Sequence, residues 1–223
     1  MQLWAFFFSA GVSMPPHFCR GDQLYDPYMH PPRSKPELRA QLKNRLDALS
    51  EQERADASSQ LCLRLIESAF YQEAGTILAY ASMAGEISLD PLIARAISDG
   101  KTVCVPRIDW DHKSMEPAQI RNLDTDLQMG RYGVRAPVGG CPLVEKSTLD
   151  LILIPGLAFD PGLRRLGRGA GFYDRMIDAL GMPRPLMVGV CFGCQVIERV
   201  PTEAHDWLMD RVFTEAGEIS QLT

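Results

Sequence analysis

The sequence predicts an α/β domain built on a mostly parallel β-sheet. Apolar segments of strand length alternate along the chain with segments of helical periodicity, as expected when helices connect parallel strands. The strand candidate at 149–154 is an almost unbroken apolar run, which is typical of strands buried on both faces of a parallel sheet. The chain has 223 residues, of which 46% are hydrophobic, so it can bury a substantial core.

Two helices are predicted before the first strand. Ser34-Lys-Pro-Glu37 has the pattern of a capping box with proline in the first turn. Leucines follow it at helical spacing: Leu38, Leu42, Leu46 and Leu49. The pattern Ser50-Glu-Gln-Glu53 repeats the capping box and predicts a second helix. We expect this helix to bury four apolar residues: Leu61, Leu65, Ile66 and Phe70.

Strands and helices then alternate to the end of the chain. The strand candidates are 76–80, 102–105, 149–154, 186–190 and 211–214. The helix candidates are 91–97, which Gly100 ends, and 172–180. Residues 109–148 are polar and contain prolines, and no element is predicted there.

The first 33 residues differ from the rest of the chain. They contain seven aromatic residues and five prolines and show neither helical nor strand periodicity. The apolar stretch 3–12 is short and no basic residue precedes it, which disfavours a signal peptide. We expect residues 1–33 to be a mobile extension or the result of a start placed too far upstream. Residues 34–223 are expected to form a single domain.

Composition excludes several classes of protein. The chain has 23 basic and 28 acidic side chains, a net charge of −5, which disfavours a dedicated nucleic-acid binder. No apolar run reaches the roughly 18 residues that a membrane span requires. Most of the six cysteines lie in apolar runs, as Cys104 and Cys191 do, which indicates buried thiols in a reducing compartment. Cys191 and Cys194 have CxxC spacing but no second pair, so packing is favoured over a metal or redox role. We expect a cytoplasmic monomer that binds small molecules, without nucleic-acid or membrane partners.

The most informative motif is the glycine–arginine segment, residues 162–175. Three alternating glycines follow a buried strand and precede a helix: Gly167, Gly169 and Gly171. Backbone N–H groups in such a loop can bind phosphate. Three arginines add positive charge suited to a polyphosphate: Arg165, Arg168 and Arg175. Asp174 could hold magnesium, which prefers oxygen ligands. The segment matches neither the Walker pattern nor the dinucleotide fingerprint, and glycine turns with surface arginines are also common without a ligand.

Three further features could contribute to a site. Lys35, Arg39 and Lys43 share one face of the first helix. This face is either solvated, or its first two residues reach the same phosphates as the glycines. The loop 81–86 follows the first strand, at the end where ligands bind in parallel sheets. There Glu86 could accept hydrogen bonds from a heterocycle beside Met83, or be a solvated charge. Asp206, next to His205, could be a metal or water-shell carboxylate.

Together these segments resemble the 5-formyltetrahydrofolate cyclo-ligase family. The likeness runs from about Lys35 to Thr214 and includes Tyr132-Gly-Val and the stretch 150–160. Its most specific part is Arg-Leu-Gly-x-Gly-x-Gly-[Tyr/Phe]-Tyr-Asp, which stands here at 165–174. Phe172 replaces a frequent tyrosine and Ala170 a frequent glycine, departures that bear on affinity more than on reaction type.

The resemblance implies a fold, a reaction and a set of residues. The fold is a three-layer α/β sandwich of the class shared with sugar-phosphate isomerases and CoA transferases. The reaction is the ATP- and Mg²⁺-dependent closure of 5-formyltetrahydrofolate to 5,10-methenyltetrahydrofolate through a phosphorylated formyl oxygen. The implied ATP-binding residues are Lys35, Arg39, Arg165, Leu166, Gly167, Arg168, Gly169, Ala170, Gly171, Phe172 and Tyr173. Of these, Arg168 and Tyr173 are the expected catalytic residues. Ala81, Met83 and Glu86 would contact the folate, and Asp174 and Asp206 would hold magnesium.

Two other functions remain open from the sequence. One is a different phosphate-ester enzyme on the same fold, which would not require ATP. The other is a non-catalytic relative that binds RNA or acts as a scaffold. The retained Lys35, Gly169, Gly171 and Asp174, together with the net charge of −5, argue against the second.

Overall fold

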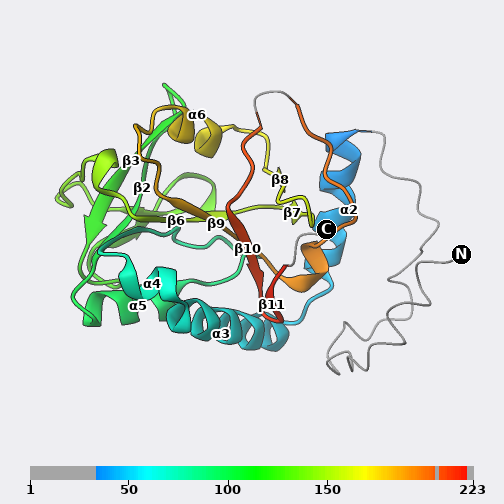
Figure 1. Ribbon diagram of the computed structural model, residues 1–223, viewed down its shortest axis with the longest axis horizontal. Helices are drawn as coiled ribbons and strands as arrows, with labels where there is room; N and C mark the ends of the chain where they lie inside the picture. Colours follow the sequence, from blue (N-terminus) through cyan, green and yellow to red (C-terminus); the bar gives the residue numbers. More distant parts are fainter. Residues whose placement is uncertain (1–33, 204–205, 220–223) are drawn as a thin grey trace, which may run out of the picture. The chain divides into compact units, whose positions relative to one another are not determined.

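The computed structural model describes residues 34–203 and 206–219, so the predictions for residues 1–33 and for His205 lie outside it. Its centre is a seven-stranded sheet (Figure 1). The strands are β1 (Thr76–Leu78), β2 (Thr102–Asp109), β3 (Ser114–Ile120), β6 (Leu151–Pro155), β9 (Leu186–Val190), β10 (Arg211–Thr214) and β11 (Gly217–Glu218). Their order is β11-β10-β9-β6-β1-β2-β3. Neighbours from β10 to β2 are parallel, whereas β10–β11 and β2–β3 are antiparallel. The predicted α/β class with a mostly parallel sheet is confirmed.

Helices cover both faces of this sheet. They are α2 (Lys35–Asp47), α3 (Glu51–Glu67), α4 (Ala69–Glu73), α5 (Asp90–Ser98) and α6 (Phe172–Asp178). Figure 1 shows α3, α4 and α5 along one face and α6 on the opposite face. Successive side chains along a strand therefore pack on opposite faces of the sheet. Leu151 and Leu153 of β6 pack in the same hydrophobic cluster as residues of α2, α3 and α5. Ile152 of β6 packs in the cluster that contains Met176 of α6. Burial on both faces explains why this strand reads as a continuous apolar run.

The predicted starts of the first two helices are confirmed, whereas the predicted extent of the second helix needs a correction. Ser34 Oγ accepts a hydrogen bond from the Glu37 N–H, and Ser50 with Glu53 forms a complete capping box. The second helix ends at Glu67, earlier than predicted, because Ser68 adopts an extended conformation and caps the short helix α4. Phe70 therefore belongs to α4 and not to the second helix.

The region without predicted elements contains a long antiparallel pair. β2 continues to Asp109 and pairs with all of β3, so that Pro106 lies opposite Pro117. Pro117 is tolerated because β3 is the edge strand of the sheet, and Pro106 lies beyond the residues of β2 that pair with β1. Further short elements are η1 (Arg131–Gly133), η2 (Lys146–Thr148), η3 (Gly193–Gln195), and two small sheets, β4 (Leu127–Met129) with β5 (Arg135–Pro137) and β7 (Ala158–Phe159) with β8 (Arg165–Leu166).

Cys104 and Cys191 lie as the composition predicts. Cys104 and Cys191 are completely buried, and both are free thiols. Burial raises the pKa of the Cys104 thiol to about 12, so it stays protonated and unreactive at neutral pH. Over the residues that the structure describes, no group of three or more His, Cys, Asp or Glu side chains could hold a metal ion. Nor does this part of the chain contain a helix with the length and apolar character of a membrane span.

Candidate active site

A cavity of about 580 Å³ lies at the carboxyl ends of the parallel strands. Its walls include the segment after β1, the end of β2 and the residues Pro155 and Gly156 at the end of β6. The volume lies within the range of roughly 300–1,000 Å³ that is usual for small-molecule sites. Ligands in open α/β sheets bind at this end of the strands.

All the site residues that the family resemblance implies line this one cavity. These residues are Lys35, Arg39, Ala81, Met83, Glu86, Arg165, Leu166, Gly167, Arg168, Gly169, Ala170, Gly171, Phe172, Tyr173, Asp174 and Asp206. They come from four separate parts of the chain that only the fold brings together. Their individual roles stay predictions.

The glycines of the glycine–arginine segment have the backbone conformations that only glycine adopts readily. Gly169 has φ +101° and Gly171 has φ +67°, both in the left-handed region. Gly171 is the N-cap of α6, and a Cβ there would lie 2.9 Å from the Arg175 side chain. Ala170 is not among the described non-glycine residues with positive φ, as its identity predicts.

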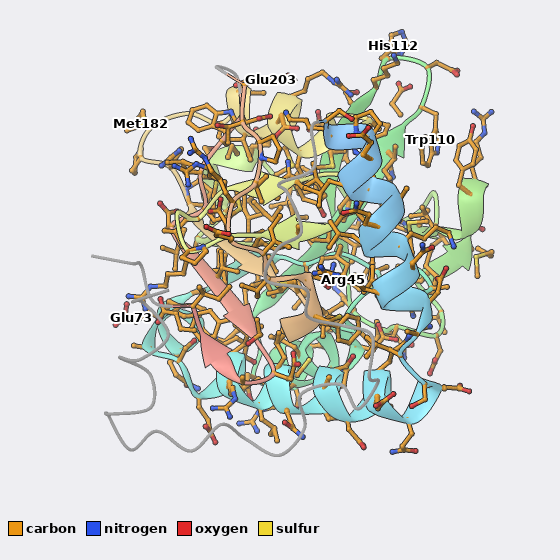
Figure 2. All side chains as sticks on the ribbon, turned by 90° about the vertical axis from the view of Figure 1, so that its right-hand side faces the viewer. Arg45, Glu73, Trp110, His112, Met182 and Glu203 are labelled. Atoms are coloured by element: carbon orange, nitrogen blue, oxygen red, sulfur yellow. The ribbon has the colours of Figure 1, made fainter. Side chains whose placement is uncertain are left out.

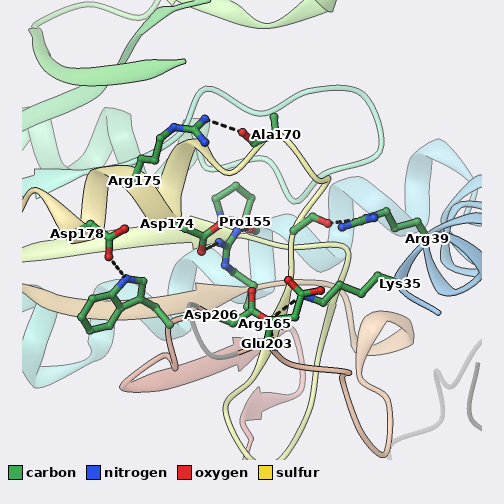
Figure 3. Close-up of polar contacts among 12 residues, drawn as sticks. Lys35, Arg39, Pro155, Arg165, Ala170, Asp174, Arg175, Asp178, Glu203 and Asp206 are labelled. Carbon is green, nitrogen blue, oxygen red and sulfur yellow. Dashed lines mark hydrogen bonds and ion pairs between the residues drawn. The ribbon is translucent and has the colours of Figure 1, made fainter. Parts of the chain in front are cut away.

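The start of α2 reaches the same cavity. Arg39 Nε donates to the Gly167 carbonyl at 3.0 Å, so the helix holds the glycine–arginine segment directly (Figure 3). Lys35 Nζ lies 2.8 Å from Asp206 Oδ2 and 3.5 Å from Glu203 Oε1. Lys43, one turn further along, is exposed and pairs with Asp47. The first two positions of the basic face therefore belong to the site, and the third is solvated.

Arg165 is a largely buried cation of the site. Its side chain is only 7% exposed, and Nη2 lies 2.7 Å from Asp174 Oδ1 (Figure 3). Nη1 donates to the Pro155 carbonyl at 3.4 Å, and Nε is buried without a partner. The guanidinium lies 5.6 Å from the centre of the Tyr173 ring. Burial, and secondarily the charge of Glu86, raise the pKa of Tyr173 well above its usual range. Its hydroxyl therefore stays protonated and can donate a hydrogen bond at neutral pH.

Glu86 is not the solvated charge that a loop position often indicates. Its side chain is 11% exposed, and Oε2 accepts from the Met83 N–H at 3.0 Å. Its Oε1 lies 3.0 Å from Arg168 Nε, so an ion pair joins the loop after β1 to the glycine–arginine segment.

Arg175 does not belong with the phosphate-binding arginines, and this prediction is wrong. Its Nε donates to the Lys113 carbonyl at 2.7 Å and its Nη2 to the Ala170 carbonyl at 2.6 Å. The described residues that line the cavity do not include it. Arg175 instead ties α6 to the turn between β2 and β3.

Sequence reasoning missed Trp110, which forms an aromatic wall of the cavity together with Tyr132 and Phe172. The Trp110 ring meets Tyr132 at 5.0 Å and Phe172 at 5.4 Å between centroids, both edge to face. Figure 2 shows Trp110 at the same end of the molecule as His112 in the β2–β3 turn. Trp110 directly follows β2, and an aromatic residue at the end of a strand could have indicated a site. It lies, however, in the region 109–148, where no element was predicted. Such a wall suits a flat heterocycle or aryl ring.

With this geometry established, comparison with known proteins decides the family. The model of the 5-formyltetrahydrofolate cyclo-ligase family matches residues 31–215. The chain belongs to this family. It is therefore an enzyme of the ligase class, and the resemblance found in the sequence is confirmed.

Curated relatives and solved structures agree. The chain is 30% identical to mouse 5-formyltetrahydrofolate cyclo-ligase over 186 residues, which cover 80% of this chain and 92% of that protein. It is 32% identical to the Saccharomyces cerevisiae enzyme of the same name over 207 residues, covering 82% and 95%. The NMR structure of Aquifex aeolicus 5,10-methenyltetrahydrofolate synthetase superimposes with a TM-score of 0.74 at 29% identity, covering 85% of this chain and 93% of that one.

Proposed function

We propose that this cyclo-ligase couples ATP cleavage to ring closure of 5-formyltetrahydrofolate, giving 5,10-methenyltetrahydrofolate, ADP and phosphate. One observation supports this above all: the glycine–arginine segment and the Met83–Glu86 loop line a single cavity. A cyclo-ligase needs its phosphate donor and its folate in contact, because the phosphoryl group passes directly between them.

The phosphate half of the cavity has the groups that phosphoryl transfer requires. The reaction depends mainly on positioning and on neutralising charge. Lys35 and Arg168 are cations of the cavity that are accessible to a ligand. Gly169 and Gly171 let the backbone approach a phosphate without a Cβ in the way. Arg39 and Arg165 hold this backbone and Asp174 in place.

The folate half is lined by the aromatic wall and by the loop after β1. Trp110 offers a ring surface to the folate, and Met83 adds an adaptable apolar contact. Phe172, which the resemblance assigns to ATP, packs against Trp110 where the two halves meet. Glu86 is the carboxylate that would accept hydrogen bonds from the N–H groups of the folate heterocycle.

Two carboxylates of the cavity fit magnesium. Mg²⁺ is usually held by one or two carboxylates together with substrate phosphates and water. Asp174 and Asp206 both line the cavity, and each accepts a hydrogen bond from a cation, Arg165 or Lys35. When bound there with ATP, magnesium would neutralise charge on the phosphates.

The proposed chemistry has two steps. The formyl oxygen attacks the γ-phosphorus and ADP leaves; the second folate nitrogen then attacks the formyl carbon, loses its proton, and inorganic phosphate departs. Arg168 would stabilise the negative charge on the transferring phosphoryl group. The protonated Tyr173 hydroxyl would donate a hydrogen bond to the same group or to the departing phosphate.

We extend the proposal to four finer points. Residues 34–223 would form one domain, which the grouping of Pro31–Thr223 into one contact unit supports. The fold would belong to the class of sugar-phosphate isomerases and CoA transferases, in line with its helix layers on both faces of the sheet. The chain would act as a monomer on small molecules rather than on nucleic acids. Free, buried cysteines support a reducing compartment, namely the cytoplasm.

A nucleotide titration separates this function from its rivals. The proposal requires that ATP binds and that Mg²⁺ strengthens the binding. A phosphate-ester enzyme that does not use ATP would show neither effect. An RNA-binding or scaffold relative would bind RNA without a dependence on ATP.

A further inference from the structure

The ion pair between Glu86 and Arg168 spans the two halves of the cavity. Arg168 lies between Gly167 and Gly169 in the glycine–arginine segment, and Glu86 lies in the loop after β1. Their side chains meet at 3.0 Å across 82 residues of sequence. Each of the two side chains therefore has the other as a charged partner.

We propose that this pair is a latch that couples the binding of the two substrates. The inference rests on the proposed function, in which ATP binds beside Arg168 and the folate beside Glu86. Each substrate must compete with the latch for its own residue. Once one substrate has opened the latch, the second binds without that competition.

Burial explains why opening the latch has a cost for Glu86. The Glu86 side chain is only 11% exposed, so water cannot fully replace Arg168 as a partner. A buried carboxylate that loses a charged partner is destabilised unless another donor takes its place. The N–H groups of a folate heterocycle are such donors. Folate bound at Glu86 therefore lowers the free energy needed to release Arg168.

The backbone and exposure of Arg168 allow it to move. Its side chain is 46% exposed, and the following residue, Gly169, has φ +101°. Because glycine adopts this range of φ without steric cost, the backbone beside Arg168 can rotate without strain. The triphosphate of ATP bears more negative charge than one carboxylate, so a released Arg168 would pair with phosphate.

Linkage makes the coupling reciprocal. If folate strengthens ATP binding by a given factor, ATP must strengthen folate binding by the same factor. Losing an ion pair at a partly exposed position would change the affinity for ATP and the affinity for folate by about two- to fivefold each. The latch would therefore favour occupancy by both substrates over occupancy by ATP alone.

The experiment measures affinities in the full chain with Mg²⁺, using the β,γ-imido analogue of ATP and 5-formyltetrahydrofolate. In the wild type, folate should tighten binding of the analogue. Glu86→Gln keeps the shape and can still accept from the Met83 N–H. Without folate it should bind the analogue about two- to fivefold more tightly than the wild type. Arg168→Gln, at a half-exposed position, should in turn bind folate more tightly in the absence of nucleotide.

Glu116→Gln is the matched control. It removes one carboxylate charge from an ion pair with Lys146, and neither residue is among the described residues that line the cavity. It should leave both affinities unchanged. The latch is refuted if the wild type binds both ligands independently, if both latch variants bind with unchanged or lower affinity, or if Glu116→Gln tightens binding equally. A wild type that binds neither ligand would refute the proposed function as well.

Discussion

Lys35, the first residue of α2, donates a hydrogen bond to Asp206, 171 positions further along the chain, at 2.8 Å. The pair joins the first element of the domain to the segment before its last long strand. Both side chains are largely buried, and both line the cavity. A cation predicted to bind phosphate and a carboxylate predicted to bind magnesium are thus paired with each other.

We predict that Lys35→Met lowers kcat/KM for ATP by at least about tenfold. A hydrogen bond to a charged group contributes roughly 1.5–3 kcal/mol, which corresponds to a factor of ten or more. Lys43→Met is the control, since Lys43 lies on the same helix but is exposed and pairs with Asp47. Steady-state kinetics at varied ATP concentration test the prediction. A wild-type kcat/KM for ATP in both variants would contradict it.

Gly171→Val should weaken ATP use by at least about tenfold, or roughly 1.4 kcal/mol. Gly171 has φ +67°, where a β-branched residue is strained, and a Cβ would lie 2.9 Å from Arg175 Nη1. Ala170→Gly, the neighbouring control, should change ATP use little. The damage is local, so the melting temperature of Gly171→Val should fall only modestly. Wild-type kcat/KM for ATP in this variant would show that the segment does not bind phosphate.

Trp110→Ala should raise KM for the folate and leave KM for ATP nearly unchanged. The substitution removes the central ring of the aromatic wall, and one aromatic contact is worth roughly 0.5–1.5 kcal/mol beyond its buried area. Trp207→Ala is the matched control, because Trp207 donates to Asp178 and is not among the described residues of the cavity. An equal rise in both KM values for Trp110→Ala would indicate general disruption of the fold instead.

The folded protein should lose stability steeply above about pH 10, the usual pKa of tyrosine. Burial raises the pKa of Tyr71, Tyr80 and Tyr173 well above that value. Below pH 10 these phenols are protonated in both states. At higher pH the unfolded chain releases protons that the folded chain retains, so the free energy of unfolding falls. Denaturant titrations of Tyr173→Phe should show a shallower decline; a decline equal to that of the wild type would contradict this assignment.

Local patterns were enough to predict the helices and the buried strands. The capping box at Ser50 and the apolar run of β6 are signals that depend on a few neighbouring residues. The same holds for Gly169 and Gly171, whose spacing predicted a loop that can bind phosphate and which both have positive φ. These features could be predicted because the physical cause lies within one segment.

Features that depend on distant partners could not be predicted. Each strand of the β2–β3 pair contains one proline, and Pro117 is compatible with a strand because β3 lies at the sheet edge. Arg175 and Arg168 look alike in sequence, yet one is held by two backbone carbonyls and the other by Glu86. The partners lie on other elements, so the spacing of the arginines does not identify the one that lines the cavity.

The most direct test of the account is turnover with defined components. The protein is incubated with 5-formyltetrahydrofolate, ATP and Mg²⁺ while the absorbance of the methenyl product and the release of ADP are followed. We predict that both products form in equal amounts, and that omitting ATP or adding EDTA abolishes them. Methenyl product at an unchanged rate without ATP, or no product with all components present, would contradict the proposed cyclo-ligase.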